Sequence, residues 1–136
     1  MKEWNQSEEW KRQCGTFCVV VKHWKSLGAG DGDNRWNVYA YIYPKHQLFT
    51  KFTDTGMYDD ACYGLPMHGG VTLLKRYIGE KGDVASIQIG CDYNHDGDSR
   101  YTHYETKDQA CSVFNDAEEL VGYLKDKDIV DQPIEK

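Results

Sequence analysis

Long hydrophobic runs are missing from this sequence. No apolar stretch approaches the ~20 residues that a membrane-spanning helix requires. Residues 1–12 are polar and charged, unlike the apolar segment of a signal peptide. Membrane insertion and secretion are therefore both disfavoured, and we expect the protein to act in the cytoplasm.

Positive charge is also in short supply. The chain has 16 Lys and Arg residues against 22 Asp and Glu residues, which gives a formal net charge of -6. Non-specific binding to nucleic acid or to an anionic membrane requires a basic face. Nucleic-acid binding is therefore not expected, whereas a partner that is itself basic remains open.

The cysteines lack the pattern of a disulfide framework or a structural zinc site. There are five of them, an odd number, at Cys14, Cys18, Cys62, Cys91 and Cys111. In a cytoplasmic protein they are reduced thiols that pack or react. Cys14 and Cys18 are four residues apart, which is not a zinc-knuckle spacing, and no second pair complements them.

What the sequence does contain predicts one folded domain. Hydrophobic residues make up 40% of the 136-residue chain and aromatic residues 13%, enough for a core and against disorder. We expect a single α+β domain over residues 1–127, consisting of a mostly antiparallel sheet with a C-terminal helix packed on it. A flexible tail is expected at 128–136.

The elements of this domain follow from local composition. Runs of β-branched and aromatic residues predict strands at 16–24, 36–43, 71–78 and 84–89, with a further short strand at 101–104. Capping residues predict a short helix within residues 1–13, with Ser7 as N-cap, and a final helix over 115–127, with Asn115 as N-cap. The glycine-rich segment 25–35 lacks the ending of a phosphate-binding loop and indicates a hairpin loop. Residues 45–66 form a long irregular connection, of a length that is usually functional or mobile.

The strand at 36–43 alternates between two faces. The apolar face consists of Trp36, Val38, Ala40 and Ile42, and the polar face of Asn37, Tyr39, Tyr41 and Tyr43. The tyrosines have two interpretations. They form a half-buried face closed by hydroxyls, which their strand propensity favours, or they provide a stacking platform for a base or another planar ligand.

The residues best suited to chemistry occur in two glycine-rich stretches, 67–72 and 90–98. The first reads Met-His-Gly-Gly-Val-Thr and the second Gly-Cys-Asp-Tyr-Asn-His-Asp-Gly-Asp. They flank two strands whose five-residue connection has the glycines of a hairpin loop. Because antiparallel pairing brings the outer ends of a hairpin together, we expect His68 to lie beside the loop of residues 92–98.

Several kinds of chemistry fit this arrangement. A divalent zinc, manganese or iron ion is one possible cofactor, with ligands from His68, Asp92, His95 and Asp98. Without a metal, His68 and His95 are the catalytic candidates, each a general base that a carboxylate could orient. Cys91 could pair with either histidine as a nucleophile, although a cysteine that ends a buried strand is more often packed.

Two further interpretations of the same residues stay open. The run from Asp92 to Asp98 begins like a calcium loop, but Ser99 and His103 stand where an EF-hand has an aliphatic residue and a glutamate, so only a non-EF calcium loop remains. Alternatively, the histidine and aspartate side chains bond to backbone amides in glycine turns, and the stretches are structural.

The paired stretches resemble a family of small uncharacterised bacteriophage and prophage proteins. Its hallmark is His-Gly-Gly-Ile/Leu-Thr followed, after a short hairpin, by Gly-Phe-Asp-Cys-Ala-His-x-Gly-Asp. The chain matches at His68, Gly69, Gly70, Thr72, Gly90, Asp92, His95, Gly97 and Asp98. It departs from the hallmark in placing its cysteine before Asp92, and in having Asn94 and Asp96 at positions where the family has small residues. The resemblance covers residues 36–127 and implies a phage product that acts inside a bacterial cell.

The function expected from these observations is that of a phage accessory protein. It would bind and neutralise a host defence factor or that factor's small-molecule ligand. The expected ligand-binding residues are those of the two stretches, namely His68, Gly69, Gly70, Thr72, Asp92, His95, Gly97 and Asp98. A metal-assisted hydrolase using His68, Asp92, His95 and Asp98 is one alternative, and an acidic protein-interaction inhibitor or nucleic-acid mimic is another. The expected partner is a host protein or a small molecule, and a homodimer remains open.

Overall fold

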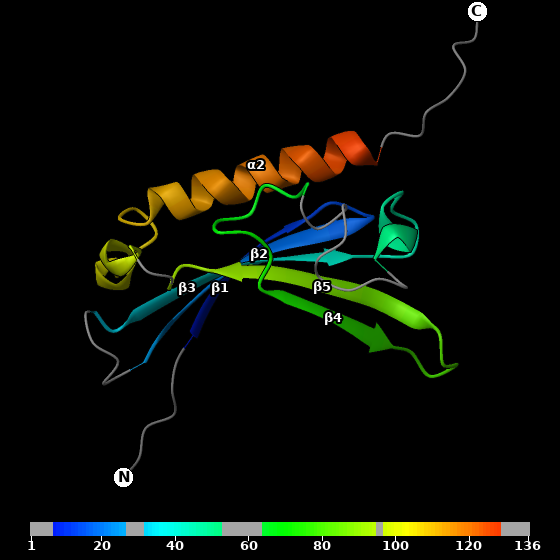
Figure 1. Cartoon of the computed structure of the whole chain (residues 1–136), viewed down its shortest axis with the longest axis horizontal. Coiled ribbons are helices and arrows are strands. Elements are labelled where there is room, and N and C mark those ends of the chain that lie inside the picture. The colour runs from blue at the N-terminus through cyan, green and yellow to red at the C-terminus, as the bar shows by residue number, and fades with distance from the viewer. Residues whose placement is uncertain (1–6, 27–31, 53–63, 95–96, 129–136) are drawn as a thin grey trace, which may run out of the picture.

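A five-stranded antiparallel sheet and one long helix dominate the computed structural model, which describes residues 7–26, 32–52, 64–94 and 97–128. The sheet has the strand order β1-β2-β3-β5-β4, and the helix lies along one of its faces (Figure 1). The strands are β1 (Ser7–Gln13), β2 (Phe17–Lys25), β3 (Asn34–Ile42), β4 (Leu73–Ile78) and β5 (Val84–Asp92). The helices are α2 (Cys111–Lys127) and two short 3-10 turns, η1 (Phe49–Lys51) and η2 (Ser99–His103). The expected α+β class, with its C-terminal helix on an antiparallel sheet, is confirmed.

The core lies between the sheet and α2. Alternate residues of β3 face the helix, and the expected apolar set from Trp36 to Ile42 is at most 2% exposed. Ile87 and Ile89 of β5 extend this layer. The helix contributes the apolar stripe expected of an amphipathic helix, which comprises Val113, Ala117, Leu120, Val121 and Leu124. Burial of this stripe fixes which side of the sheet the helix covers.

The predicted hairpins are present. β2 pairs with β3 and places Lys25 opposite Asn34, so the segment 25–35 connects two antiparallel strands, although its residues 27–31 lie outside the described part. β4 pairs with β5 as expected, and β5 continues three residues beyond its predicted end, through Asp92. Within the expected long connection 45–66, the structure describes η1 and residues 64–66, and 53–63 are outside the described residues.

The helix expected within residues 1–13, with Ser7 as N-cap, is wrong, because residues 7–13 form β1; residues 1–6 lie outside the described part. This strand pairs along its whole length with β2, from Ser7 opposite Trp24 to Gln13 opposite Cys18. The tight turn between them uses Gly15, whose φ of 83° suits glycine. One capping serine and one apolar side chain are weak helix signals, and seven cross-strand pairs outweigh them.

Two other elements differ from the prediction. The expected strand at 101–104 is wrong: its first three residues belong to η2, which ends at His103, and both Tyr101 and Thr102 are buried instead of alternating. Backbone bonds from Tyr101 N to Asp98 O and from Tyr104 N to Tyr101 O close these turns. The final helix ends at Lys127 as expected but begins at Cys111, four residues before the expected N-cap, with no side-chain cap. Of the expected tail 128–136, only residue 128 is described.

No helix in the described ranges is long and apolar enough to cross a bilayer. The thiols described, those of Cys14, Cys18, Cys91 and Cys111, are free.

Candidate functional site

The two glycine-rich stretches meet through one hydrogen-bonded pair. His68 Nε2 lies 2.8 Å from Asp98 Oδ1, as the hairpin geometry predicts for His68 and the loop that follows β5. The His68 ring stacks on Tyr93 with a centroid distance of 4.2 Å and meets the edge of Tyr101 at 5.3 Å. We call these four residues the aromatic clip. Tyr93 donates its hydroxyl proton to Asp116 of α2, at 2.7 Å, so the aromatic clip lies on the helix-covered side of the sheet.

The glycines of the two stretches shape the turns that bring the clip together. Gly69 and Gly70 have φ values of 69° and 89°, and Gly97 has a φ of 90°, a region that other residues rarely adopt. Thr72 N donates to Gly90 O at 2.9 Å and thereby extends the β4–β5 pairing toward His68. The glycines therefore hold the backbone in place for the His68–Asp98 contact.

The proposed metal ligands do not all lie on one side of the sheet. Asp92 pairs with Asn37 and alternates with Tyr93, which places it on the face opposite the aromatic clip. Its Oδ1 accepts a bond from Asn94 N at 3.2 Å. His95 lies outside the described residues, as does Asp96. Within the described ranges no three His, Cys, Asp or Glu side chains converge as metal ligands would. Of the predicted ligands, His68 and Asp98 are in direct contact.

Cys91 is part of the core and not a nucleophile beside an imidazole. Its side chain is 1% exposed, and burial raises the pKa of its thiol to about 12. The contact with His68 that lowers this pKa comes from the His68 backbone. A thiol held in its neutral form at physiological pH cannot attack a substrate efficiently.

The remaining histidines have structural partners or lie on the surface. The buried ring of His23 contacts Glu8 Oε1 at 2.9 Å and Asn34 Oδ1 at 2.8 Å, in agreement with its expected core position. His46 is buried too, with its Nε2 2.9 Å from Leu124 O. His103 is exposed at the end of η2.

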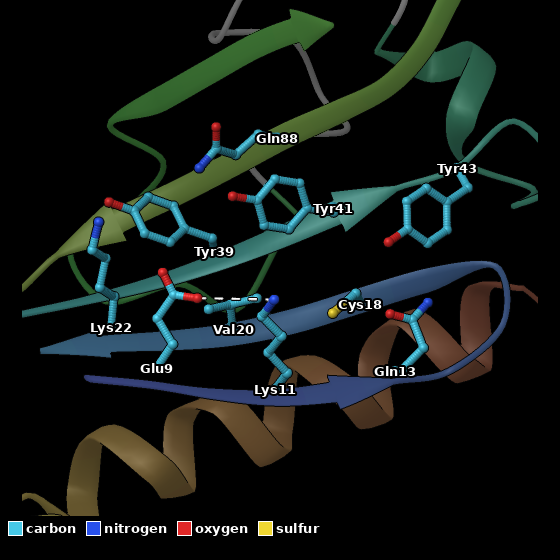
Figure 2. Close-up of a pocket in the computed structure, with 10 residues that line it drawn as sticks. All are labelled: Glu9, Lys11, Gln13, Cys18, Val20, Lys22, Tyr39, Tyr41, Tyr43 and Gln88. Atoms are coloured by element: carbon cyan, nitrogen blue, oxygen red, sulfur yellow. Dashed lines mark ion pairs between the residues drawn. The ribbon is translucent and has the colours of Figure 1, made fainter. Parts of the chain in front are cut away.

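A groove on the open face of the sheet, opposite α2, contains the predicted row of tyrosines. It has a volume of about 310 Å³. Figure 2 shows one wall made by the tyrosines of β3 and its end, and the other made by side chains of β1, with small side chains of β2 between them. The lining residues are Glu9, Lys11, Gln13, Cys18, Val20, Lys22, Tyr39, Tyr41, Tyr43 and Gln88. We call this feature the tyrosine groove.

Strand register explains the shape of the tyrosine groove. Cys18 pairs with Tyr41, and Val20 pairs with Tyr39 and with Lys11. The small side chains of Cys18 and Val20 therefore lie between larger ones on both neighbouring strands, and they form a floor. The sequence predicted the tyrosine row but not the opposite wall, because residues 7–13 were expected to be helical.

Gly90 connects the second glycine-rich stretch to the tyrosine groove. It pairs with Tyr39 across β3 and β5, and a Cβ at Gly90 would lie 2.5 Å from Cδ1 of the Tyr39 ring. The ring therefore lies across the glycine, in a position that any side chain there would disturb. Gly90 is thus required for the orientation of the first tyrosine in the row.

The tyrosine groove carries a small positive charge in an acidic protein. Lys11 forms an ion pair with Glu9 at 3.9 Å, and Lys22 adds a second cation whose Nζ lies 5.9 Å from the Trp24 ring centroid. Burial raises the pKa of both Tyr39 and Tyr41. Their hydroxyls therefore remain protonated at physiological pH and are available as hydrogen-bond donors.

No protein-family model matches this chain, and neither a curated protein nor a solved structure is found to match it. The function is therefore inferred from the residues of the groove and the aromatic clip and from their chemistry.

Proposed function

We propose that this protein binds a small molecule in the tyrosine groove and acts as a binding protein, not as a catalyst. The observation that carries the proposal is the row of three tyrosines at alternate positions, 39, 41 and 43, opposite a charged wall and over a floor of small side chains. Sites for small molecules are mainly apolar or aromatic and contain a few polar groups that orient the ligand. The tyrosine groove offers three aromatic rings and a floor of small side chains for such a ligand, together with a larger share of polar groups, because five of its ten lining side chains are charged or amides.

The groups that a hydrolase would use support this choice over catalysis. The His68–Asp98 pair has the geometry of an oriented general base, but the His68 ring is also stacked on Tyr93, and its side chain is 24% exposed. Asp92 lies on the opposite face of the sheet. Catalysis by His68 with Asp92 would require both groups to reach one substrate atom, and the sheet separates them.

The biological role that we propose is the one the family resemblance implies. A phage product in the cytoplasm of a bacterial cell would use the groove to sequester a small-molecule ligand of a host defence factor. The placement of Gly90 supports a connection between the family motif and the groove, because this motif glycine underlies Tyr39. The other motif residues, around His68 and Asp98, support the loop ends of the same hairpin.

The experiment is a binding measurement with a metabolite fraction. The purified full-length protein is incubated with the compounds below about 1 kDa from a bacterial extract, and retained mass is measured by native mass spectrometry. We expect a discrete mass increase in the wild type that is lost in Tyr41→Ser. Tyr41 is partly exposed on the open face, so its truncation should leave the fold intact.

Two controls make the result specific. Tyr41→Phe retains the ring and should retain the mass increase, whereas His68→Ala, measured well below its unfolding temperature, should leave it unchanged. A wild type that retains no compound would contradict the proposal. Retention that is lost in His68→Ala but not in Tyr41→Ser would contradict the proposal and indicate a binding site at the glycine-rich stretches.

A further inference from the structure

We infer that the tyrosine groove takes a mononucleotide-like ligand, a planar heterocycle joined to one anionic group, with the ring on Tyr39 and Tyr41 and the anion at Lys22. This inference rests on the proposed function and specifies its ligand class. Three observations support it: the size of the groove, the orientation of its aromatic rings and the position of its lysines.

Size limits the ligand to a single small unit. The groove volume of about 310 Å³ lies at the lower end of the ~300–1,000 Å³ range of small-molecule sites. The wall from Glu9 to Gln13 spans four residue steps, roughly 13 Å of strand. A single ring with a sugar-sized linker fits this length, and a long polyanion is disfavoured by the overall charge of -6.

The tyrosine rings provide a surface for a planar group. Figure 2 views the open face with α2 behind the sheet, and the rings of Tyr41 and Tyr43 turn their faces toward the viewer. Tyr39 lies across Gly90, which leaves room for the ring to lie flat on the sheet. Aromatic rings displayed on a sheet stack with nucleobases, since every base has a π-face. The Gln88 amide on β5 lines the same groove, and because its Oε1 accepts a hydrogen bond from the Tyr77 hydroxyl, its NH₂ group is the donor that it offers to a heterocycle.

The charges indicate where the anionic group binds. Lys22 lies one alternation beyond Val20, the partner of Tyr39, so its Cα is about 7 Å further along the strand. Figure 2 shows its ammonium group at the Tyr39 end of the groove. No ion pair of Lys22 occurs among the described residues, whereas Lys11 is paired with Glu9. A heterocycle stacked on the tyrosine row thus has a cation at the Tyr39 end of the groove for its anionic group.

The test compares nucleotides with nucleosides by isothermal titration calorimetry at low salt. The probes are adenosine 5′-monophosphate and uridine 5′-monophosphate, together with adenosine and uridine. We expect at least one nucleotide to bind about 5- to 10-fold more tightly than its nucleoside, through one charge-assisted hydrogen bond that is weakened by the solvent in the open groove. Lys22→Gln should abolish that difference, and Lys125→Gln, which removes an exposed lysine from α2 on the other side of the sheet, should not.

The stacking part of the inference has its own variants. Tyr41→Ser should weaken nucleotide binding by roughly 5- to 100-fold, the range for loss of one base–aromatic stack, and Tyr41→Phe should remain within about 3-fold of the wild type. Melting temperatures of all variants, measured in parallel, identify any loss that comes from unfolding.

The outcomes separate the ligand class from the groove itself. Nucleosides that bind as tightly as nucleotides, with no effect of Lys22→Gln but a loss in Tyr41→Ser, would overturn the anionic ligand and leave the proposed function standing. No binding of any of the four probes by the folded wild type would overturn the ligand class, and the metabolite experiment would still test the groove. Nucleotide binding that no groove variant changes would overturn the inference as well.

Discussion

Replacing His68 with alanine should destabilise the protein without removing its binding activity. The imidazole lies between the carboxylate of Asp98 and the ring of Tyr93, and its side chain is 24% exposed. Alanine at position 68 removes the hydrogen bond and the stacked ring. It also leaves Asp98, 9% exposed, without its imidazole partner.

The expected cost follows from these contacts. A hydrogen bond to a charged group contributes about 1.5–3 kcal/mol, and a stacked aromatic pair about 0.5–1.5 kcal/mol beyond its buried area. Partial exposure of the His68 ring reduces both contributions. We therefore expect His68→Ala to lower the free energy of unfolding by roughly 2–4 kcal/mol, which places the aromatic clip among the strongly stabilising contacts.

Urea unfolding, followed by tryptophan fluorescence, measures this cost. His103→Ala is the matched control, because this histidine is exposed, and its substitution should change stability by no more than about 0.5 kcal/mol. In a double-mutant cycle, His68→Ala and Asp98→Ala should show a coupling energy of roughly 1–3 kcal/mol. A stability change below about 0.5 kcal/mol for His68→Ala, together with loss of ligand binding, would refute a structural role and favour a functional one.

Three further predictions concern the groove, the buried thiol and metal binding. Gly90→Ala should displace the Tyr39 ring and cost about 1–3 kcal/mol in urea unfolding; a stability equal to wild type would contradict the close contact. Burial raises the pKa of the Cys91 thiol from 9.0 to about 12, so the folded state holds this proton more tightly than the unfolded state does. The resulting contribution to the free energy of unfolding, on the order of 4 kcal/mol, is fully present below pH 9 and is lost as pH rises from about 9 to about 12. Cys91→Ala should lack this component, and in the native protein the exposed Cys111 should react with a thiol reagent at pH 8 while Cys91 does not. Zinc at pH 7.5 should change the melting temperature of wild type and His68→Ala equally, and a zinc-dependent increase seen only in wild type would restore the metal hypothesis.

The strands of the core could be predicted because burial and local preference agree there. The middle of β2 is apolar on both faces, and Cys18 and Val20 on its open face are buried, as Val19 and Val21 on its core face are. The alternation from Trp36 to Ile42 identified the helix-facing side of β3. These patterns involve residues that are adjacent in the sequence, so they can be recognised without knowledge of the tertiary structure.

The elements that were missed depend on contacts that are distant in the sequence. In β1, Trp10 stacks on Trp36 at 5.8 Å, and Arg12 forms an ion pair with Glu118 of α2. Neither contact has a signal within residues 7–13. The helix start at Cys111 was hidden for a related reason, because Ala110 provides no side-chain cap and tertiary burial of Val113 extends the helix instead.

The candidate site was predictable only in part. Hairpin geometry placed His68 beside Asp98, because antiparallel pairing is a strict constraint. It did not determine the face, and the alternation through Asp92 and Tyr93 puts the carboxylate of Asp92 on the opposite side. The groove was not predicted because its second wall belongs to β1, which was expected to be helical. The groove forms only when β1 pairs with β2.

We propose that ligand binds on the open face of the sheet and that the aromatic clip has a structural role. The most direct measurement is a ¹H–¹⁵N NMR titration of the full-length protein with the nucleotide or metabolite that binds. We expect the amide shifts to concentrate in β1, β2 and β3 around Val20 and Tyr41, with the amides of His68 and Gly70 nearly unchanged. Shifts that concentrate at His68, Gly70 and Asp98, with the groove unchanged, would contradict the proposal.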